Sequence, residues 1–260
     1  MSMSADFSGQ TVVITGASGG IGRVLARRYA RHGANVALVA RRRDELAITA
    51  GAIAEEGGAA STHVVDIRDE QQCRELVAGV MERWGRLDVL INNAAVPGTD
   101  QPVSEATVDN WQDVLATNLV APMVLTREAL CQSMIEARHG NIQFMSSAAA
   151  RIVQPRKAHY AAAKLGLSAL AQTLALEVGP SGIRVNTLVI GSVAGELFDN
   201  YVGRRAREED IDPGELRQRL AALNKIGRLV QPDEVAEVSM WLASDASSAI
   251  TGQDINVTGG

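Results

Sequence analysis

The sequence predicts an α/β fold, a doubly wound, seven-stranded parallel sheet in a single domain that spans residues 1–260. Three observations support this prediction. Short runs rich in β-branched residues alternate along the chain with longer stretches of helical periodicity. Several of these short runs are apolar almost throughout, as strands are when helices cover both faces of a parallel sheet. The length of 260 residues suits one hydrophobic core, and no Pro/Ser-rich linker or internal repeat divides the chain.

Seven segments are predicted to be strands, in chain order 11–15, 35–40, 61–65, 87–91, 141–146, 183–190 and 254–257. The first helix is expected over 21–31, where Ile21, Leu25 and Tyr29 share one face. A second helix is expected over 160–178, and it is rich in Ala and Leu around most of its circumference. Such a helix must be covered on more than one face, either by a neighbouring subunit or by deep burial in a monomer.

A polar stretch of more than thirty residues, 192–225, separates the last two strands. Long excursions in compact domains often cover a binding site, so this stretch is predicted to form a helical substrate lid within the domain. A solvated surface insertion is the alternative interpretation.

The composition argues against several classes of partner. The formal net charge is −5 and only 3% of the residues are aromatic, so we expect no nucleic acid partner. Residues 1–6 lack the basic and apolar regions of a secretory signal, and no apolar run reaches the roughly 18 residues that span a bilayer. A cytoplasmic protein without a membrane partner is expected. Cys73 and Cys131 show no paired spacing, so buried or semi-buried thiols are expected rather than a metal site or a disulfide.

A glycine-rich segment, 15–22, follows the first strand directly and opens the first helix. Glycines permit a tight turn that a pyrophosphate can approach closely, and the start of a helix presents free N–H groups to an anion. No Gly-Lys-Ser/Thr ending is present, so a triphosphate-binding loop is not supported. The segment therefore predicts a dinucleotide site, and its cofactor-binding residues are Gly16, Ser18, Gly20, Ile21 and Gly22.

The end of the second strand indicates which dinucleotide is bound. A site for NAD usually places a carboxylate there, whereas this chain has Ala40 followed by three arginines. Arg41 can offer a charge-assisted contact to a ribose 2′-phosphate. NADP(H) is therefore the predicted cofactor, and NAD is the alternative. A solvated, basic start of a helix, with Asp44 and Glu45 following, is also compatible with the pattern.

Ser147, Tyr160 and Lys164 form the predicted catalytic group. Tyr160 and Lys164 are four residues apart, so they share one face of the expected helix. An ammonium group held close to a phenol favours the phenolate and lowers the pKa of the phenol, which makes the tyrosine a usable acid and base. Ser147 can donate a hydrogen bond to the oxygen of a substrate carbonyl. Tyr160 as an ordinary amphipathic core residue is the alternative.

With these motifs together, the chain resembles the short-chain dehydrogenase/reductase family, and in particular its 3-oxoacyl reductase-like members, over nearly its whole length. The family's Rossmann-like fold agrees with the sheet predicted above. The resemblance rests on the following residues and segments: 15–22, Asp66, Ile67, 92–95, Asn118, Ser147, 160–164, 183–186 and 251–253.

The resemblance implies roles for individual residues. Tyr160 would be the general acid in reduction and the general base in oxidation, and Lys164 would hold the nicotinamide ribose. Ser147 would position the carbonyl; it is chosen over Ser146 because it lies thirteen residues before Tyr160, the usual spacing of the family. Asn118 would hold a water that links Lys164 to solvent.

The resemblance also implies the remaining cofactor contacts and the assembly. Asp66 and Ile67 would contact the adenine, Asn93 the adenosine ribose region, and Val193 belongs to the same cofactor-binding set. A homotetramer or homodimer would form through two long helices. The chain ends at Gly260, directly after the last expected strand, so no C-terminal tail is expected to reach a neighbouring subunit.

Four positions depart from the pattern of the family. Ala95 replaces a glycine near the cofactor, and Ile190 replaces a proline. Gly195 stands where a threonine commonly contacts the nicotinamide carboxamide, and Gly19 where NADP enzymes often have a second basic residue. None of the four removes a group that performs the chemistry.

The predicted function is that of an oxidoreductase that transfers hydride between NADP(H) and a carbonyl or secondary alcohol, with a small molecule as its partner. A non-catalytic dinucleotide-binding regulator and a cofactor-independent lyase of the same fold are the alternatives. The lid is expected to form much of the substrate pocket together with Val96, Pro97 and Ala149. Arg151, Arg156 and His159 are expected near its mouth, either to favour an anionic or polyhydroxylated substrate or as ordinary surface charges; the substrate itself is not readable from the sequence.

Overall fold

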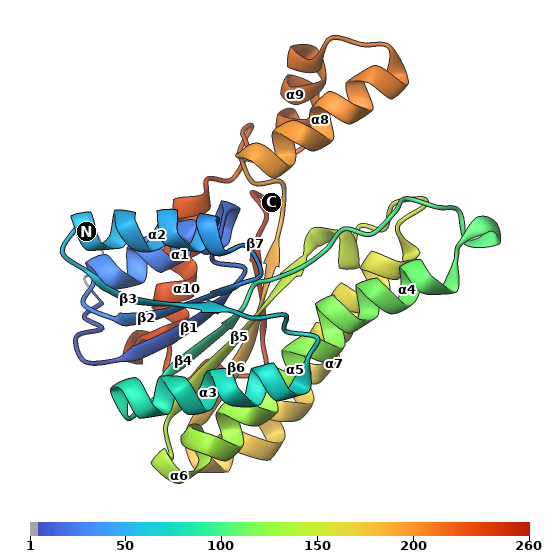
Figure 1. The fold of residues 1–260 in the computed structure, drawn as a ribbon. Helices are drawn as coiled ribbons and strands as arrows, with labels where there is room; N and C mark the ends of the chain where they lie inside the picture. The colour runs from blue at the N-terminus through green and yellow to red at the C-terminus, as the bar shows by residue number, and fades with distance from the viewer. Residues whose placement is uncertain (1–4) are drawn as a thin grey trace.

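A computed structural model describes residues 5–260. Its core is one sheet of seven parallel strands in the order β3-β2-β1-β4-β5-β6-β7 (Figure 1). The strands are β1 (Thr11–Thr15), β2 (Asn35–Ala40), β3 (Ala59–Val64), β4 (Val89–Asn92), β5 (Gly140–Ser147), β6 (Ile183–Ile190) and β7 (Asp254–Val257). The predicted fold class is confirmed. Four strands have the predicted bounds, and the ends of β3, β4 and β5 differ by one or two residues.

The helices are α1 (Gly20–Arg31), α2 (Arg43–Glu55), α3 (Glu70–Trp84), α4 (Val108–Leu115), α5 (Ala121–Ala129), α6 (Ile135–Ala137), α7 (Ala158–Val178), α8 (Glu196–Glu209), α9 (Pro213–Ala222) and α10 (Pro232–Ala243). Helices α1, α2 and α10 cover one face of the sheet, and α3, α5 and α7 cover the other (Figure 1). Successive residues of a strand point to opposite faces, so Val12 and Val13 enter different hydrophobic clusters. The edge strand β3 has only exposed and half-buried residues, unlike the fully buried β1 and β4.

Two turns of π-helix, Ala116–Val120 and Leu130–Met134, join α4, α5 and α6 into one continuous helix, Val108–Ala137. Within residues 5–260 this is the one helix long and apolar enough to cross a membrane, with a mean hydropathy of 1.3 over its most apolar window. It is not an unbroken apolar run of the kind that the sequence analysis looked for, because Arg127 and Glu128 lie within it. Of the residues in that window, 56% are buried inside the fold. The helix packs against α3 and α7, as a core helix does.

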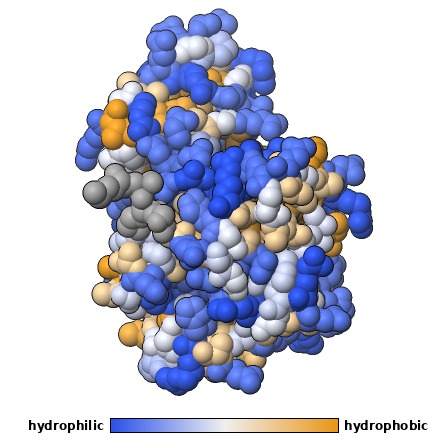
Figure 2. Space-filling view, turned by 90° about the vertical axis from the view of Figure 1, so that its left-hand side faces the viewer, coloured by the Kyte–Doolittle hydropathy of each residue, from blue (hydrophilic) through white to orange (hydrophobic). Residues whose placement is uncertain are grey.

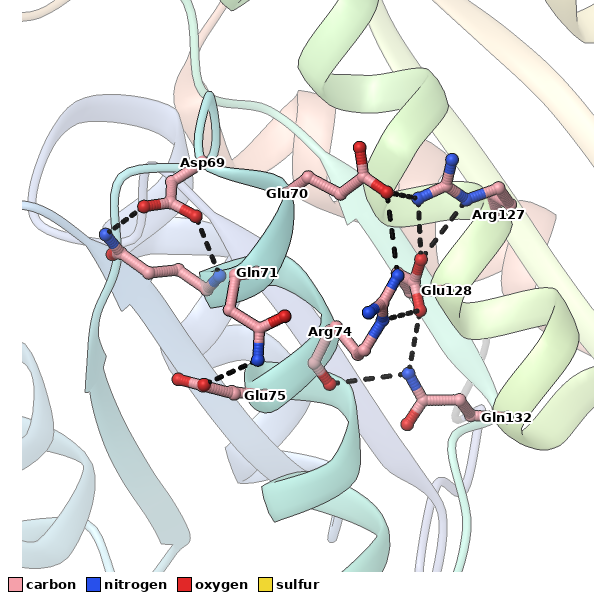
Figure 3. A network of polar contacts seen from close by, with 9 residues as sticks. Asp69, Glu70, Gln71, Arg74, Glu75, Arg127, Glu128 and Gln132 are labelled. Atoms are coloured by element: carbon pink, nitrogen blue, oxygen red, sulfur yellow. Dashed lines mark hydrogen bonds and ion pairs between the residues drawn. The ribbon is translucent and has the colours of Figure 1, made fainter.

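Charged side chains fasten α3 to α5 on this face of the sheet (Figure 3). Glu128, whose side chain is only 8% exposed, accepts a hydrogen bond from Arg127 at 2.8 Å and another from Gln132 at 3.0 Å. Arg127 also pairs with Glu70 of α3, and Arg74 of α3 lies 3.7 Å from Glu128. A network that shares one buried carboxylate fixes the two helices more firmly than isolated exposed ion pairs do.

The two cysteines differ in their surroundings. Cys73 of α3 is buried in the hydrophobic cluster on this face of the sheet. Its thiol donates to the Ile67 carbonyl at 3.2 Å, and burial raises its pKa to about 11. Cys131 is exposed on the second π-helical turn, so the expectation of a buried or semi-buried thiol was wrong for this residue. Both thiols are free.

Helices α8 and α9 occupy most of the segment 192–225 and project from the body as a separate lobe (Figures 1 and 2). Val202, Ala206 and Leu216 form a small hydrophobic cluster of their own in this lobe. The helical content predicted for the segment is thus present. Its action as a lid stays a prediction.

Candidate active site

The order of the strands creates a crevice between β1 and β4. The chain moves outward from β1 through β2 to β3 and then returns to the other side of β1 for β4. The loops that follow β1 and β4 therefore leave the sheet in opposite directions, and ligands of such sheets bind at this switch point, outside the carboxyl ends of the strands. The glycine-rich turn follows β1 there, and Asn93 follows β4.

The turn after β1 leaves no room for side chains at two of its glycines. Gly16 has a φ of 69°, and a Cβ there would lie 2.8 Å from the side-chain nitrogen, Nδ2, of Asn93. A Cβ on Gly22 would overlap the Gly16 carbonyl oxygen. The turn is tied to β4 because Asn93 donates to the Thr15 carbonyl at 2.9 Å and the Thr15 hydroxyl accepts from the Asn93 amide at 2.9 Å. This compact cradle at the start of α1 fits a dinucleotide pyrophosphate.

Gly22→Ala is expected to destabilise the protein by about 1–3 kcal/mol, because the added methyl forces the turn away from α1. Binding of a nicotinamide cofactor should be lost at the same time, since the displaced turn no longer presents its N–H groups. Thermal unfolding and a cofactor fluorescence titration measure the two effects. Gly51→Ala in α2, where a Cβ meets nothing within 4 Å, is the control. It should stabilise by about 0.5–1 kcal/mol, and equal behaviour of the two variants would contradict the packing argument.

The arginines after β2 lie beside this turn. Arg41 and Arg42 are both exposed. The Arg42 guanidinium lies 3.3 Å from the Ser18 hydroxyl, so Arg42, which the sequence analysis did not nominate, reaches the glycine turn directly. Arg23 of α1 donates to the Ser18 carbonyl at 2.6 Å and to the Glu45 carboxylate at 2.7 Å. The positive charge of Arg23 is therefore already paired with Glu45. Sequence spacing did not separate Arg41 from Arg42, because the choice depends on how the start of α2 lies against the turn.

The predicted adenine-contacting residues follow β3 at the same edge. The Asp66 carboxylate is held by Arg68 at 2.6 Å, and this hydrogen bond is the main reason that its pKa lies below the ordinary value, with a smaller contribution from Arg41. Ile67 is buried in the cluster under α3. Val193 lies on the opposite side of the crevice at the base of the lobe, where it pairs as a bridge with Val230.

Ser146 and Ser147 end β5 and have different environments. Ser146 is buried, and its hydroxyl donates to the Lys164 carbonyl at 2.8 Å, so it is used to hold α7 against the sheet. Ser147 is half-buried, and its oxygen accepts from the Ala149 amide at 3.2 Å. Because that contact uses only a lone pair, the hydroxyl proton can be donated to Tyr160 or to a substrate oxygen. The assignment of Ser147 rather than Ser146 to the site stays a prediction.

Tyr160 and Lys164 lie one turn apart on α7, next to the end of β5. The Lys164 ammonium is 5.7 Å from the centre of the Tyr160 ring and donates to the Met145 carbonyl at 2.7 Å. Burial lowers the pKa of Lys164 to about 8. Burial also raises the pKa of Tyr160, and the hydrogen bond with Ser147 acts in the opposite direction. The lowered tyrosine pKa that the sequence analysis expected is therefore wrong for this structure, because desolvation of the phenol outweighs its favourable neighbours.

Asn118 is fully buried on the first π-helical turn. Its side-chain oxygen accepts from the Val96 amide at 2.8 Å, and its side-chain nitrogen donates to the Val96 carbonyl at 2.8 Å. This double contact fixes the loop after β4 over α7. The π-turn widens the helix at this point, a distortion that is frequent at functional sites. The predicted water relay through Asn118 stays a prediction, and the contact to Val96 is a role that the sequence did not indicate.

His159 was expected near the mouth of the pocket, but it lies in the interior. It is 1% exposed, its Nε2 is 3.2 Å from the Pro97 carbonyl oxygen, and Gly98 packs on its ring. The expectation was wrong because the residue before Tyr160 points inward, under the loop after β4. Arg151 and Arg156 are exposed; Arg151 pairs with Asp254, and Arg156 donates to the Asp100 carbonyl at 3.3 Å.

Comparison with known proteins gives consistent matches along the chain. Residues 16–260 match a family model described as enoyl-(acyl carrier protein) reductase. A short-chain dehydrogenase/reductase, astE, from Aspergillus oryzae is 33% identical over 97% of this chain and 94% of its own. The NADPH complex of a variant actinorhodin polyketide ketoreductase superimposes with a TM-score of 0.92 at 32% identity, covering 100% of this chain and 98% of that one. An NAD⁺-bound xylitol dehydrogenase gives a TM-score of 0.92 at 29% identity, covering 98% and 99%.

Proposed function

This chain belongs to the short-chain dehydrogenase/reductase family, and we propose that it transfers hydride between NADP(H) and a ketone or secondary alcohol with Tyr160 as the general acid and base. The family relationship makes it an oxidoreductase that uses a nicotinamide dinucleotide and acts on CH–OH groups. The observation that carries the finer proposal is the position of Ser147, Tyr160 and Lys164 at the end of β5 and on α7, beside the glycine cradle.

Each side chain has a defined task in reduction. The bound nicotinamide supplies the hydride that adds to the carbonyl carbon. Tyr160 donates its phenolic proton to the carbonyl oxygen, so the C=O π bond is replaced by one C–H and one O–H bond. Ser147 donates a hydrogen bond to the same oxygen as negative charge develops on it. Lys164 stabilises the phenolate that remains, and oxidation of an alcohol follows the reverse order.

A cofactor titration followed by a substrate panel tests this proposal. NADPH and NADH are titrated by fluorescence, and the form that binds is then used with ketones and secondary alcohols. Turnover supports the oxidoreductase. Binding without turnover across the panel would instead favour the non-catalytic regulator, and failure to bind either dinucleotide would favour the cofactor-independent lyase.

The preference for NADP(H) rests on Arg41 and Arg42. Both are exposed, Arg42 contacts Ser18 of the glycine turn, and the Asp66 carboxylate, which Arg41 influences, is already paired with Arg68. The double variant Arg41→Ala, Arg42→Ala is expected to weaken NADPH binding about tenfold or more, since each charge-assisted hydrogen bond contributes about 1.5–3 kcal/mol. NADH binding should stay within about twofold, because NADH lacks the 2′-phosphate. Arg43→Ala is the control, and an equal loss for both cofactors would contradict the assignment.

The outer surface of α5 and α7 supports assembly into a homodimer or homotetramer. Four exposed apolar side chains lie on these helices and the π-turn before α5: Val120, Met123, Leu165 and Leu176. Such a face on two long helices is typical of a contact between subunits. Sedimentation equilibrium should give two or four times the mass of the chain, and Leu165→Glu should lower it. A monomeric wild-type protein would overturn this part of the proposal.

A further inference from the structure

The α8–α9 lobe has few attachments to the rest of the fold. Its apolar side chains pack on one another, with Phe198, Tyr201 and Leu220 surrounding the small cluster of the lobe. Glycines with positive φ stand at both of its ends, Gly195 at 135° and Gly227 at 69°. A lobe with its own core between two such connections can move as a rigid body.

One ion pair joins this lobe to the body. The Arg204 guanidinium of α8 lies 3.3 Å from the carboxylate of Asp100, which belongs to the loop after β4. Within residues 5–260, no other ion pair or hydrogen bond connects α8 or α9 to an element outside the lobe and its connections. The position of the lobe relative to the rest of the fold therefore depends on Asp100 more than on any other polar group.

A second cation links the same carboxylate to the start of the catalytic helix. Lys157, which immediately precedes α7, lies 4.0 Å from the same oxygen of Asp100 and 5.1 Å from the centre of the Tyr201 ring. Arg204 lies 5.9 Å from the centre of that ring. Asp100 and Tyr201 thus each contact both cations, and three segments meet here: the loop after β4, the start of α7 and the lobe.

Asp100 is itself held in place by backbone contacts. Its carbonyl accepts a hydrogen bond from Arg156 at 3.3 Å, and the next amide, Gln101, donates to the Arg156 carbonyl at 3.0 Å. The preceding residue, Thr99, exchanges two hydrogen bonds with Asn110 of α4, both at 2.9 Å. The carboxylate is therefore presented from a fixed point, so the lobe is the partner that moves.

From this geometry we propose that Asp100 is a positioning residue that fixes the α8–α9 lobe over the substrate site through its ion pair with Arg204. Through Lys157, which lies three residues before Tyr160, Asp100 also sets the position of the lobe relative to Tyr160. Its consequence for substrate binding rests on the proposed function; its consequence for the lobe does not. The Arg204 side chain is 51% exposed, so the ion pair is partly screened. Loss of such a pair changes the equilibrium between seated and displaced lobe by about two- to fivefold.

Lobe position is measured directly by pulsed electron paramagnetic resonance. Spin labels are attached to Ile48→Cys on α2 and Arg219→Cys on α9, both exposed positions, in a Cys131→Ser background. In Asp100→Asn the population with a displaced lobe should rise about two- to fivefold. Asp100→Glu should restore the wild-type distribution. Glu208→Gln is the matched control, because it removes the other carboxylate near Arg204, at 4.0 Å within α8, and leaves the contact with Asp100.

Ionic strength provides a second measurement on the same labelled proteins. At about 1 M salt the screening length falls to about 3 Å, so the wild-type distance distribution should approach that of Asp100→Asn, whereas the variant should change little. An unchanged distribution in Asp100→Asn, or an equal shift in Glu208→Gln, would overturn the proposal.

The kinetic consequence separates this proposal from the proposed function. With a substrate in hand, Asp100→Asn should raise KM about two- to fivefold while kcat changes less and the cofactor dissociation constant is unchanged. A lobe that responds to Asp100→Asn in a protein that turns over no carbonyl or alcohol would leave the positioning role standing and overturn the proposed function. Normal turnover with an unaffected lobe would do the opposite.

Discussion

Replacing Tyr160 with Phe is expected to lower kcat about a hundred- to ten-thousandfold, the usual contribution of a positioned general acid or base. Only the phenolic hydroxyl is removed, and the ring can still pack between Ser147 and Lys164. The cofactor dissociation constant should therefore change by no more than about twofold, because the glycine turn and the arginines beside it are untouched. Steady-state kinetics with the substrate found by the panel, together with a cofactor titration, measure both quantities.

Tyr29→Phe is the matched control for this prediction. The hydroxyl of Tyr29 is also buried, but it bonds Ser239 at 3.0 Å in the core between α1 and α10, away from the crevice. Its loss should destabilise the protein by about 1 kcal/mol and leave kcat unchanged. If Tyr160→Phe kept wild-type turnover, proton transfer by Tyr160 would be wrong. Equal losses of kcat in both variants would point to damage to the fold instead.

Replacing Lys164 with Met is expected to abolish turnover and to stabilise the protein at the same time. Burial lowers the pKa of Lys164 to about 8, from an ordinary 10.5. Keeping the buried ammonium charged therefore costs about 3 kcal/mol of folding stability at neutral pH. Met is apolar and fills a similar volume. After about 1 kcal/mol is subtracted for the lost hydrogen bond to Met145, Lys164→Met should be more stable by about 2 kcal/mol.

The difference in stability should depend on pH in a defined direction. The folded state binds this proton more weakly than the unfolded state, so the wild-type protein bears the full cost below pH 8. It regains stability as the pH rises from about 8 to about 10.5, by about 1.4 kcal/mol per unit at most. Denaturant unfolding of both proteins between pH 6.5 and about 9.5 should show the advantage of Lys164→Met shrinking through this window.

Lys225→Met, at an exposed position, is the control and should show neither effect. A Lys164→Met protein less stable than the wild type at neutral pH would show that the hydrogen bond to Met145 outweighs desolvation. Lys164 would then contribute to stability as well as to catalysis. The expectation here is the opposite, that a buried charge needed for catalysis costs stability.

The sequence by itself determined the parts of this protein that depend on local patterns. Strands such as β1 and β2 were predicted to the residue, because a run that is apolar on both faces is specified by composition alone. The glycine turn was equally legible, since a positive φ at Gly16 and close packing at Gly22 exclude other residues. The spacing of Tyr160 and Lys164 also predicted that both lie on one face of α7, because residues four apart in a helix are neighbours on its surface.

Only the tertiary structure decided matters that depend on segments far apart in the chain. Desolvation of Tyr160 depends on the loops and helices around it, so the direction of its pKa could not be read from its neighbours in sequence. Arg42 rather than Arg41 touches Ser18 because of the angle at which α2 meets the turn. The meeting of Asp100 with Arg204 joins residues 104 positions apart. Local propensity and periodicity carry no information about such contacts, because they form only when the sheet brings the loops at its carboxyl edge together.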